Sequence, residues 1–307
     1  MGRSGRVIGK AKGSVYRQYS GQSVTTSNPD THLYGPSGPL SSCDQLLSRV
    51  ASLGLPWGAE TSIKLGPKRL LANRVLVGLP RRSLDDATVR RLVEEIRIPA
   101  AGWDFLAGSL PRSNAVFLGI EESPEGVVGK AYLEFWDDVR RQVRAEPGTA
   151  PRLLHLGVKW SDRRPGQFEV AQYHCHPLLS ARDVMRRMAG VYEGDALVTA
   201  CPLAQEVLRR GLRREPTAGL LYEEVSEAGN PRRSWDVNLY KTGLLVRDAA
   251  PELEAIGRHF GVDGTALSAA LAPLQDRLLG HLSGGMDRRG QEFVSVYAEL
   301  QALPAEG

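Results

Sequence analysis

The sequence of 307 residues has only three cysteines, Cys43, Cys175 and Cys201. They are too few and too scattered for a disulfide framework, and none forms a CxxC pair of the kind that zinc sites use. No run approaches the roughly 20 apolar residues that a membrane span requires, and the N-terminus has no signal-peptide pattern. We therefore expect a cytoplasmic protein in a reducing compartment, with no membrane partner.

Neither sign of charge dominates the chain. Its net charge of +4 comes from 39 basic and 35 acidic residues, which is too small an excess to require a nucleic-acid partner. The hydrophobic content of 42% is that of a soluble globular chain with a sizeable core. Residues 1–31 are rich in Gly, Ser, Arg and Lys without an apolar period, which predicts a flexible basic tail. We assign residues 32–303 to a single domain and residues 304–307 to a second tail.

A pair of short strands recurs five times along this domain, and helical segments separate the copies. The first copy runs from Ala59 to Leu79, and the later second strands carry Tyr132, Tyr173, Tyr240 and Tyr297. Ten antiparallel strands with helices between the hairpins predict an α+β fold. We expect a closed ten-stranded antiparallel β-barrel, built from five helix–hairpin–helix repeats and surrounded by α-helices.

The expected helices have recognisable ends. One helix ends at Gly54, and another starts at Ser83, where Asp86 completes a capping-box-like pattern. A third helix is capped by Ser180. Their apolar stripes indicate that each covers an apolar surface.

Strand alternation predicts which side chains face the interior of the barrel, because neighbouring residues of a strand point to opposite faces. The polar faces are Glu60, Ser62 and Lys64; Lys130, Tyr132 and Glu134; His155, Gly157 and Lys159; Asp236, Asn238 and Tyr240; and Ser295 and Tyr297. The opposite register would place these faces outside and would leave the amphipathic helices without an apolar surface to cover. We therefore expect a polar lumen.

A lumen lined by cations, tyrosines and carboxylates suits the ionisation of an allylic diphosphate. Lysine and arginine compensate the diphosphate charge, and tyrosine hydroxyls donate hydrogen bonds to its oxygens. Tyrosine faces stabilise a carbocation and shield it from water. A carboxylate can take the proton that the attacked nucleophile releases.

These residues resemble the αββα (ABBA) prenyltransferase barrels and, within them, the cyanobactin-type peptide prenyltransferases. The resemblance covers about Leu33 to Leu303 and is closest in AETSIKLGPKRLLANR of the first hairpin. It implies that Glu60 is the acceptor-side base. The diphosphate-binding residues that we expect are Lys64, Arg74, Lys130, Lys159 and Asn238. The tyrosines expected to shield the cation are Tyr132, Tyr173, Tyr240 and Tyr297.

The sequence departs from the family where relatives carry basic residues. Glu134 and Ser295 occupy two such places, and Glu169 and Ala171 precede Tyr173. Either Mg²⁺ bound with the diphosphate compensates for these missing cations, or the barrel is a weak or altered enzyme. No DDxxD motif is present, so a trinuclear magnesium mechanism is not expected. We expect neither a metal held by protein ligands nor an organic cofactor.

The resemblance also places Tyr222 beside the prenyl tail, where its bulk would favour a five-carbon donor; alternatively, the ring only fills space. Acceptor-side candidates are Glu134, Glu224, Asp236 and His155. Inward carboxylates would favour a cationic acceptor such as arginine, because they can pair with its guanidinium. Alternatively, some of them form structural pairs with lysines of the lumen.

We therefore expect a monomeric enzyme that moves a dimethylallyl group from dimethylallyl diphosphate to a peptide. The acceptor would be Tyr or Trp, or alternatively Arg, in a ribosomal and often macrocyclic peptide. One alternative is the same barrel acting on a small aromatic molecule. A peptide enzyme should have a wide barrel mouth, whereas a small-molecule enzyme should cap it. The other alternative is a barrel that binds a peptide or lipid without chemistry.

Overall fold

The computed structural model describes residues 41–192, 198–227 and 229–302. The two predicted tails, 1–31 and 304–307, lie outside the described residues. In the part that is described, no helix combines the length and the apolar character needed to cross a bilayer.

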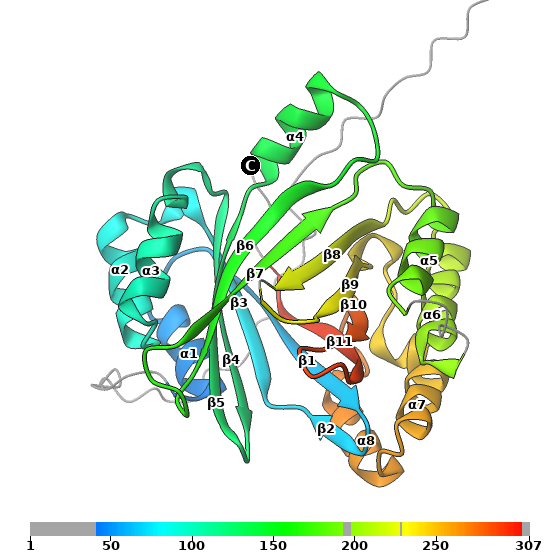
Figure 1. Cartoon of the computed structure of the whole chain (residues 1–307). Helices are drawn as coiled ribbons and strands as arrows, with labels where there is room; N and C mark the ends of the chain where they lie inside the picture. The colour runs from blue at the N-terminus through cyan, green and yellow to red at the C-terminus, as the bar shows by residue number, and fades with distance from the viewer. Residues whose placement is uncertain (1–40, 193–197, 228, 303–307) are drawn as a thin grey trace, which may run out of the picture.

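The described strands form one antiparallel sheet that closes on itself (Figure 1). They are β1 (Gly58–Gly66), β2 (Arg69–Leu71), β3 (Arg74–Pro80), β4 (Ala115–Ser123), β5 (Gly126–Glu134), β6 (Arg152–Ser161), β7 (Phe168–Cys175), β8 (Leu221–Glu227), β9 (Arg233–Asn238), β10 (Leu279–Met286) and β11 (Glu292–Gln301). The short β2 pairs only with β1, and the other ten strands close into a barrel because β11 pairs with β1. The predicted ten-stranded barrel is confirmed.

Helices surround this barrel, as the apolar stripes predicted. They are α1 (Cys43–Ala51), α2 (Asp86–Glu95), α3 (Ala100–Ala107), α4 (Trp136–Ala145), α5 (Ala181–Gly190), α6 (Cys201–Arg214), α7 (Ala250–His259) and α8 (Gly264–Leu271). In Figure 1, α1 to α3 lie on one side of the barrel and α5 to α8 on the other.

Several helix details differ from the sequence prediction, and the first is that α1 ends at Ala51 and not at Gly54. Ser83 ends a short 3₁₀ helix, Arg81–Ser83, and α2 begins three residues later. Its N-cap is Asp85, whose carboxylate accepts a hydrogen bond from the backbone N–H of Thr88. Helix α3 was not predicted. Ser180 caps α5 as expected, by accepting from the backbone N–H of Asp183.

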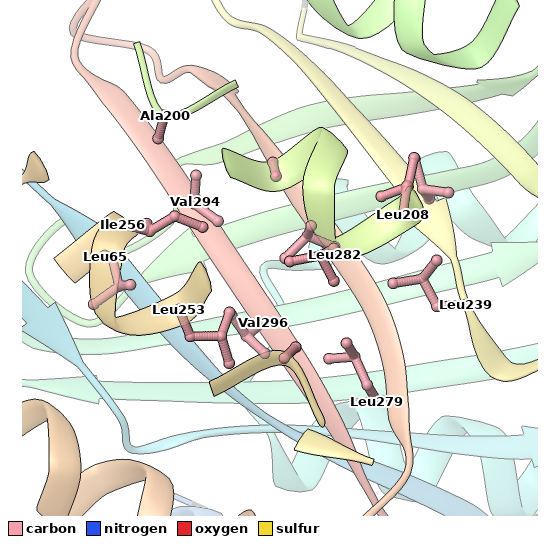
Figure 2. Close-up of a cluster of buried hydrophobic side chains, with 14 of the residues drawn as sticks. Leu65, Ala200, Leu208, Leu239, Leu253, Ile256, Leu279, Leu282, Val294 and Val296 are labelled. Carbon is pink, nitrogen blue, oxygen red and sulfur yellow. The ribbon is translucent and has the colours of Figure 1, made fainter. Parts of the chain in front are cut away.

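The apolar core lies outside the barrel, between strands and helices. Figure 2 shows one of its two large clusters, where Leu253 and Ile256 of α7 lie beside Val294 and Val296 of β11. The second large cluster joins α1 to α3 to strands β1 and β3 to β6. Since the aliphatic faces of the strands serve the helices, their polar faces line the interior. The predicted inward faces of β1, β5 and β6 are therefore confirmed.

Candidate active site

The barrel surrounds a cavity of about 760 Å³, counted to its opening. Eight of the residues proposed from the sequence line it: Glu60, Arg74, Lys130, Tyr132, His155, Tyr173, Asp236 and Tyr297. Among its other lining residues are Phe117, Glu223 and His281. The lining is polarised along the barrel, with cations at one end and carboxylates with imidazoles at the other.

Two cations at the first end share one carboxylate. Arg74 Nε and Lys130 Nζ each lie 2.9 Å from Oε2 of Glu121, which faces Arg74 across the β3–β4 pair. Burial opposes ionisation of Glu121, but Lys130 and Arg74 outweigh it and hold the pKa well below the usual range. The guanidinium of Arg74 also donates to Ser295 Oγ at 3.4 Å. Arg74 and Lys130 are thus fixed side by side at the cavity wall.

A second set of cations lies around Glu227. Lys159 Nζ is 2.8 Å from Oε1 of Glu227, and Arg232 contacts the same oxygen. Burial and the charge of Arg232 lower the pKa of Lys159 well below its usual value. Lys159 faces Lys130 across the β5–β6 pair but does not line the cavity, because its ammonium is paired with Glu227.

Lys64 lies at the same end but outside the cavity lining. Its Nζ is 4.4 Å from the ring centroid of Phe293. Burial, followed by the charge of Arg74, lowers the pKa of Lys64 to about 7. This lysine is therefore poised to gain a proton if negative charge enters the cavity.

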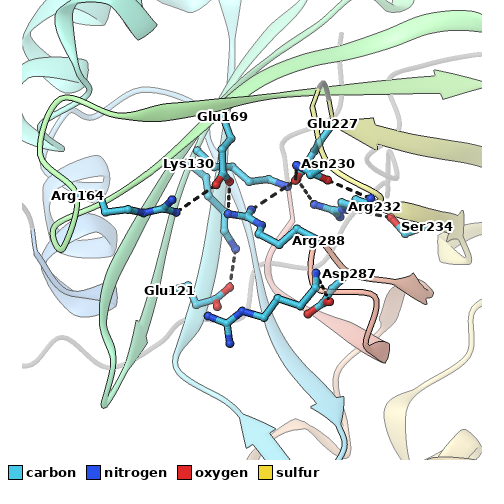
Figure 3. Close-up of polar contacts among 12 residues, drawn as sticks. Glu121, Lys130, Arg164, Glu169, Glu227, Asn230, Arg232, Ser234, Asp287 and Arg288 are labelled. Carbon is cyan, nitrogen blue, oxygen red and sulfur yellow. Dashed lines mark hydrogen bonds and ion pairs between the residues drawn. The ribbon is translucent and has the colours of Figure 1, made fainter.

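An ion-pair network spans the turns at this end of the barrel (Figure 3). Arg288, in the β10–β11 turn, contacts Glu169 of β7 and lies 3.6 Å from Glu227 of β8. Arg164, in the β6–β7 turn, also binds Glu169, at 3.2 Å. The network links three hairpins around the cationic end.

The opposite end holds the predicted base. Glu60 is 2% exposed, and its Oε1 accepts a 2.6 Å hydrogen bond from the hydroxyl of Tyr240. His281 Nε2 lies 3.8 Å from the same oxygen, and His281 Nδ1 is 2.7 Å from Asp236 Oδ1. Burial raises the pKa of Glu60 and outweighs His281 and Tyr240, which lower it. Burial disfavours the imidazolium of His281, but Glu60 and Asp236 raise its pKa to about 9.

A second imidazole repeats this arrangement. His155 Nδ1 lies 3.0 Å from Glu223 Oε2, and His155 Nε2 lies 3.8 Å from Glu134 Oε1. Burial raises the pKa of Glu134 to about 7. Each imidazole also meets a tyrosine ring edge-to-face: His155 meets Tyr173, and His281 meets Tyr297.

Tyrosines occupy the middle of the lumen. The rings of Tyr132 and Tyr173 are perpendicular, with centroids 5.6 Å apart. Tyr132 lies over Gly157, its cross-strand partner, where a Cβ would be 2.0 Å from the Tyr132 ring. Tyr297 lies 5.9 Å from the guanidinium of Arg74. These three rings therefore separate the cationic end from the carboxylate end.

Two predicted residues lie on the wrong face of β8. Tyr222 is fully buried among the apolar side chains between the barrel and its helices, so the predicted position beside a prenyl tail is wrong. Glu224 pairs with Arg187 of α5 at 2.9 Å, so its predicted place on the acceptor side is also wrong. The reason is strand alternation, which turns Glu223 inward opposite Asp236.

Asn238 and Tyr240 are displaced from their predicted settings. Asn238 ends β9, and its amide lies 3.1 Å from His281 Nε2, among the imidazoles and not among the cations. Tyr240 lies beyond the strand, on the 3₁₀ helix Tyr240–Thr242, and its ring stands edge-on to His281. Neither residue is brought together with Arg74 and Lys130.

Four residues of the site were missed: Glu121, Glu223, Arg232 and His281. A signal existed for Glu121, because alternation in AVFLGIEES places it on the face of Phe117. His281 was missed because the segment before it, GTALSAALAPLQDRLLG, has the composition of a helix up to Gly280, whereas β10 already begins at Leu279. Glu223 was missed through the same register error that selected Glu224.

The described residues contain no group of three or more His, Cys, Asp or Glu that could hold a metal ion. At the cationic end, Glu121, Glu169 and Glu227 are each engaged by lysine or arginine. The protein side chains there do not fit a magnesium site of their own. Whether Mg²⁺ arrives with the diphosphate stays a prediction.

Comparison with known proteins identifies the fold. No family model and no curated protein match the sequence. Among solved structures, 5-dimethylallyltryptophan synthase from Streptomyces coelicolor matches with a TM-score of 0.53 at 16% identity, over 81% of this chain and 82% of that one. The prenyltransferase PriB, in complex with L-tryptophan and dimethylallyl thiolodiphosphate, matches with a TM-score of 0.53 at 18% identity, over 81% of both chains.

A third structure, 6-dimethylallyltryptophan synthase from Micromonospora olivasterospora in complex with DMASPP and Trp, matches with a TM-score of 0.51 at 15% identity. The match covers 89% of this chain and 88% of that one. The chain therefore has the ABBA prenyltransferase fold. Identities this low establish the shared barrel, and its chemistry has to be argued from the cavity.

Proposed function

We propose that this barrel transfers a dimethylallyl group from dimethylallyl diphosphate to a nucleophilic acceptor. The observation that carries the proposal is the order of charged and aromatic side chains along the cavity. Arg74 and Lys130 lie at one end, tyrosine rings in the middle and Glu60 at the other. This order matches the three needs of the reaction, which are a site for the leaving diphosphate, a shield for the cation and a base.

The diphosphate would bind at Arg74 and Lys130. The guanidinium of arginine offers paired N–H donors to phosphate oxygens, and lysine adds a point charge. The C1–O bond of the donor breaks, and both its electrons leave with the diphosphate. Buried cations stabilise that developing charge without reorganisation, which lowers the barrier to ionisation.

The allyl cation would form between Tyr132, Tyr173 and Tyr297. Aromatic faces attract a cation, by about 2 kcal/mol or more when the pair is desolvated. The rings also exclude water, which would otherwise convert the cation to an alcohol. The acceptor attacks the cation, and a bond forms between the allyl carbon and the nucleophilic atom.

Glu60 would take the proton that the acceptor loses. The hydrogen bond from Tyr240 and the charge of His281 both favour the ionised carboxylate, against the burial that disfavours it. A carboxylate so placed acts as a general base, typically worth a factor of about 10²–10⁴ in rate. Magnesium bound with the diphosphate would add charge compensation when present.

For the acceptor we propose an aromatic side chain. The cyanobactin-type resemblance favours an aromatic residue within a peptide, whereas the tryptophan complexes of PriB and of the Micromonospora enzyme favour a small molecule. The cavity lies within the closed barrel, so the donor tail and the acceptor group have to share it. A peptide would therefore present a single side chain to the cavity while the rest stayed outside.

Mass spectrometry tests the proposal directly. The protein is incubated with dimethylallyl diphosphate, with and without Mg²⁺, and with tryptophan, tyrosine, cyclic peptides or linear peptides. We expect a product heavier by one dimethylallyl unit, lost in Glu60→Gln and Arg74→Ala. It should persist in Glu224→Gln, a matched carboxylate on the outer face. Absence of product with every acceptor, together with no donor binding by calorimetry, would contradict the proposal.

A further inference from the structure

Buried carboxylates at the two ends of the lumen differ in their partners. At the cationic end, Glu121 meets Arg74 and Lys130, and Glu227 meets Lys159 and Arg232. At the other end, the carboxylates form ion pairs only with histidines among the described residues. These four carboxylates are Glu60, Glu134, Glu223 and Asp236.

Charge balance at the carboxylate end is therefore incomplete. Two imidazoles, His155 and His281, serve the four carboxylates. With both imidazoles protonated and all four carboxylates ionised, two negative charges stay uncompensated inside the barrel. A buried charge without a partner is costly, so such a site either binds protons or binds a cation.

Glu223 and Asp236 form the centre of this excess. They face each other across the β8–β9 pair and both line the cavity. Cross-strand neighbours of this kind have Cβ atoms about 4.5–5.5 Å apart. Glu223 uses Oε2 on His155, and Asp236 uses Oδ1 on His281. Within the described ranges, the second oxygen of each accepts no hydrogen bond, so a ligand can meet both oxygens.

Glu134 gives a second and independent sign of an unmet positive charge. Its side chain is 1% exposed, and Oε1 has no hydrogen-bond partner. Buried carboxylate oxygens in folded proteins are normally hydrogen-bonded. Burial raises the pKa values of Glu134 and Asp236, which shows that this end of the barrel disfavours further negative charge.

We propose that the acceptor carries a positive charge, as an ammonium or guanidinium group, which docks between Glu223 and Asp236. This inference rests on the proposed function and names the class of acceptor. Either group donates several N–H bonds and supplies the charge that this end lacks. Docking there would hold the nucleophilic part of the acceptor between Glu60 and the tyrosine rings.

Paired probes that differ only in charge test the inference. Tryptamine is compared with its neutral alcohol analogue tryptophol, and butylguanidine with its neutral urea analogue butylurea. Binding to the full chain, with dimethylallyl thiolodiphosphate present, is measured by calorimetry. We expect each cationic probe to bind at least about tenfold tighter than its neutral partner, equivalent to about 1.4 kcal/mol. Binding should also release protons, because the carboxyl groups ionise as the cation enters.

Variants assign the preference to its carboxylates. We expect Glu223→Gln and Asp236→Asn each to reduce the tenfold preference to within about threefold, and Glu224→Gln to leave it intact. Glu224 is the adjacent carboxylate on the outer face, paired with Arg187. Thermal denaturation checks that Glu223→Gln and Asp236→Asn fold. If one of them does not fold, the other tests the assignment. If the folded variants of Glu223 and Asp236 keep the tenfold preference for the cationic probes, the assignment to these carboxylates is wrong.

Product analysis separates this inference from the proposed transfer. Prenylation of tryptophol as fast as tryptamine, with equal affinities, would leave the transfer standing and overturn the cationic acceptor. Selective, Glu223-dependent binding of tryptamine and butylguanidine without product from any acceptor would support the cation site and count against the transfer. Equal binding of the charged and neutral probes in the native protein overturns the inference whatever the product assay gives.

Discussion

The hydroxyl of Tyr240 donates a 2.6 Å hydrogen bond to Oε1 of Glu60, although the two residues are 180 positions apart in the sequence. Barrel closure creates this contact, because β1 pairs with β11, and β11 pairs with β10. Gly280 of β10 leaves room for it, since a Cβ there would be 2.4 Å from Glu60 Oε1. The environment of the proposed base is therefore a product of the closed sheet.

Removal of that hydroxyl should change the pH dependence of the reaction. A hydrogen bond to the ionised carboxylate lowers its pKa, so Tyr240→Phe should raise the pKa of Glu60. A base works only when ionised, so the acidic limb of kcat/KM should move to higher pH by about one unit. Tyr192→Phe is the control, because its buried hydroxyl lies on the outer face, where it accepts from Trp235 Nε1. An unchanged limb in Tyr240→Phe would mean that another group is the base.

Glu121 should weaken donor binding while it stabilises the free protein. It neutralises Arg74 and Lys130, and the diphosphate must compete with it for both. In Glu121→Gln we expect donor affinity to rise several-fold, while the melting temperature falls because two buried cations lose their common counter-charge. Calorimetry and thermal denaturation measure the two effects. Glu122→Gln, which alters the neighbouring side chain near the backbone of Cys43, should change neither by much.

Lys64 should take up a proton when the donor binds. Its pKa is lowered to about 7 by burial and Arg74, with Arg232 adding to this and Glu121 and Asp287 opposing it. A bound diphosphate adds negative charge and raises the pKa, so at pH 8 the protein should gain up to one proton per donor. At pH 6, where Lys64 is already protonated, the uptake should vanish.

Calorimetry in two buffers of different ionisation enthalpy measures this uptake, with dimethylallyl thiolodiphosphate as the ligand. Lys64→Met should abolish the uptake at pH 8. Lys68→Met is the matched control, because Lys68 lies exposed in the β1–β2 turn. Equal proton uptake by the native protein and Lys64→Met would assign the titration to another group.

Strand alternation made the fold and much of the lumen predictable. The period of two in β1, β5 and β6 identified inward residues such as Glu60, Lys130 and His155, because each strand has one apolar face. The aliphatic residues opposite them predicted the helical coat. Apolar periodicity and cap residues located most of the helices.

The site residues that the sequence did not predict depend on contacts between strands, which the pattern of a single strand does not reveal. Glu223 and Glu224 are adjacent carboxylates, and only the pairing with β9 shows that Glu223 faces inward. His281 follows a segment that reads as a helix until β10 begins. The ion pairs of Glu121 with Arg74 and Lys130 join side chains from three strands, β4, β3 and β5, so they depend on how these strands pair. Sequence periodicity identifies a face, whereas ion pairing depends on register between strands.

Gly157 should be essential for the position of Tyr132. A Cβ there would be 2.0 Å from Tyr132 Cδ1, so Gly157→Ala must push the ring away. We expect a loss of about 1–3 kcal/mol in the free energy of unfolding, as for other overpacked sites. Transfer should fall and hydrolysis of the donor should rise, because the displaced ring no longer shields the cation. Gly148→Ala, where the added Cβ meets nothing within 4 Å, should leave the free energy of unfolding, the transfer and the donor hydrolysis unchanged.

Tyr222 should govern stability and not the length of the donor. It is fully buried between β8 and the helices, and its hydroxyl donates to Glu224 at 3.2 Å. Tyr222→Gly should cost about 3–5 kcal/mol of unfolding free energy, as large-to-small core substitutions do. Because the ring lies outside the lumen, the ratio of rates with geranyl and dimethylallyl diphosphate should stay constant. Leu76→Ala, which enlarges the cavity wall itself, should raise that ratio. A selective gain with the ten-carbon donor in Tyr222→Gly would show that the prenyl tail reaches through the wall of the barrel.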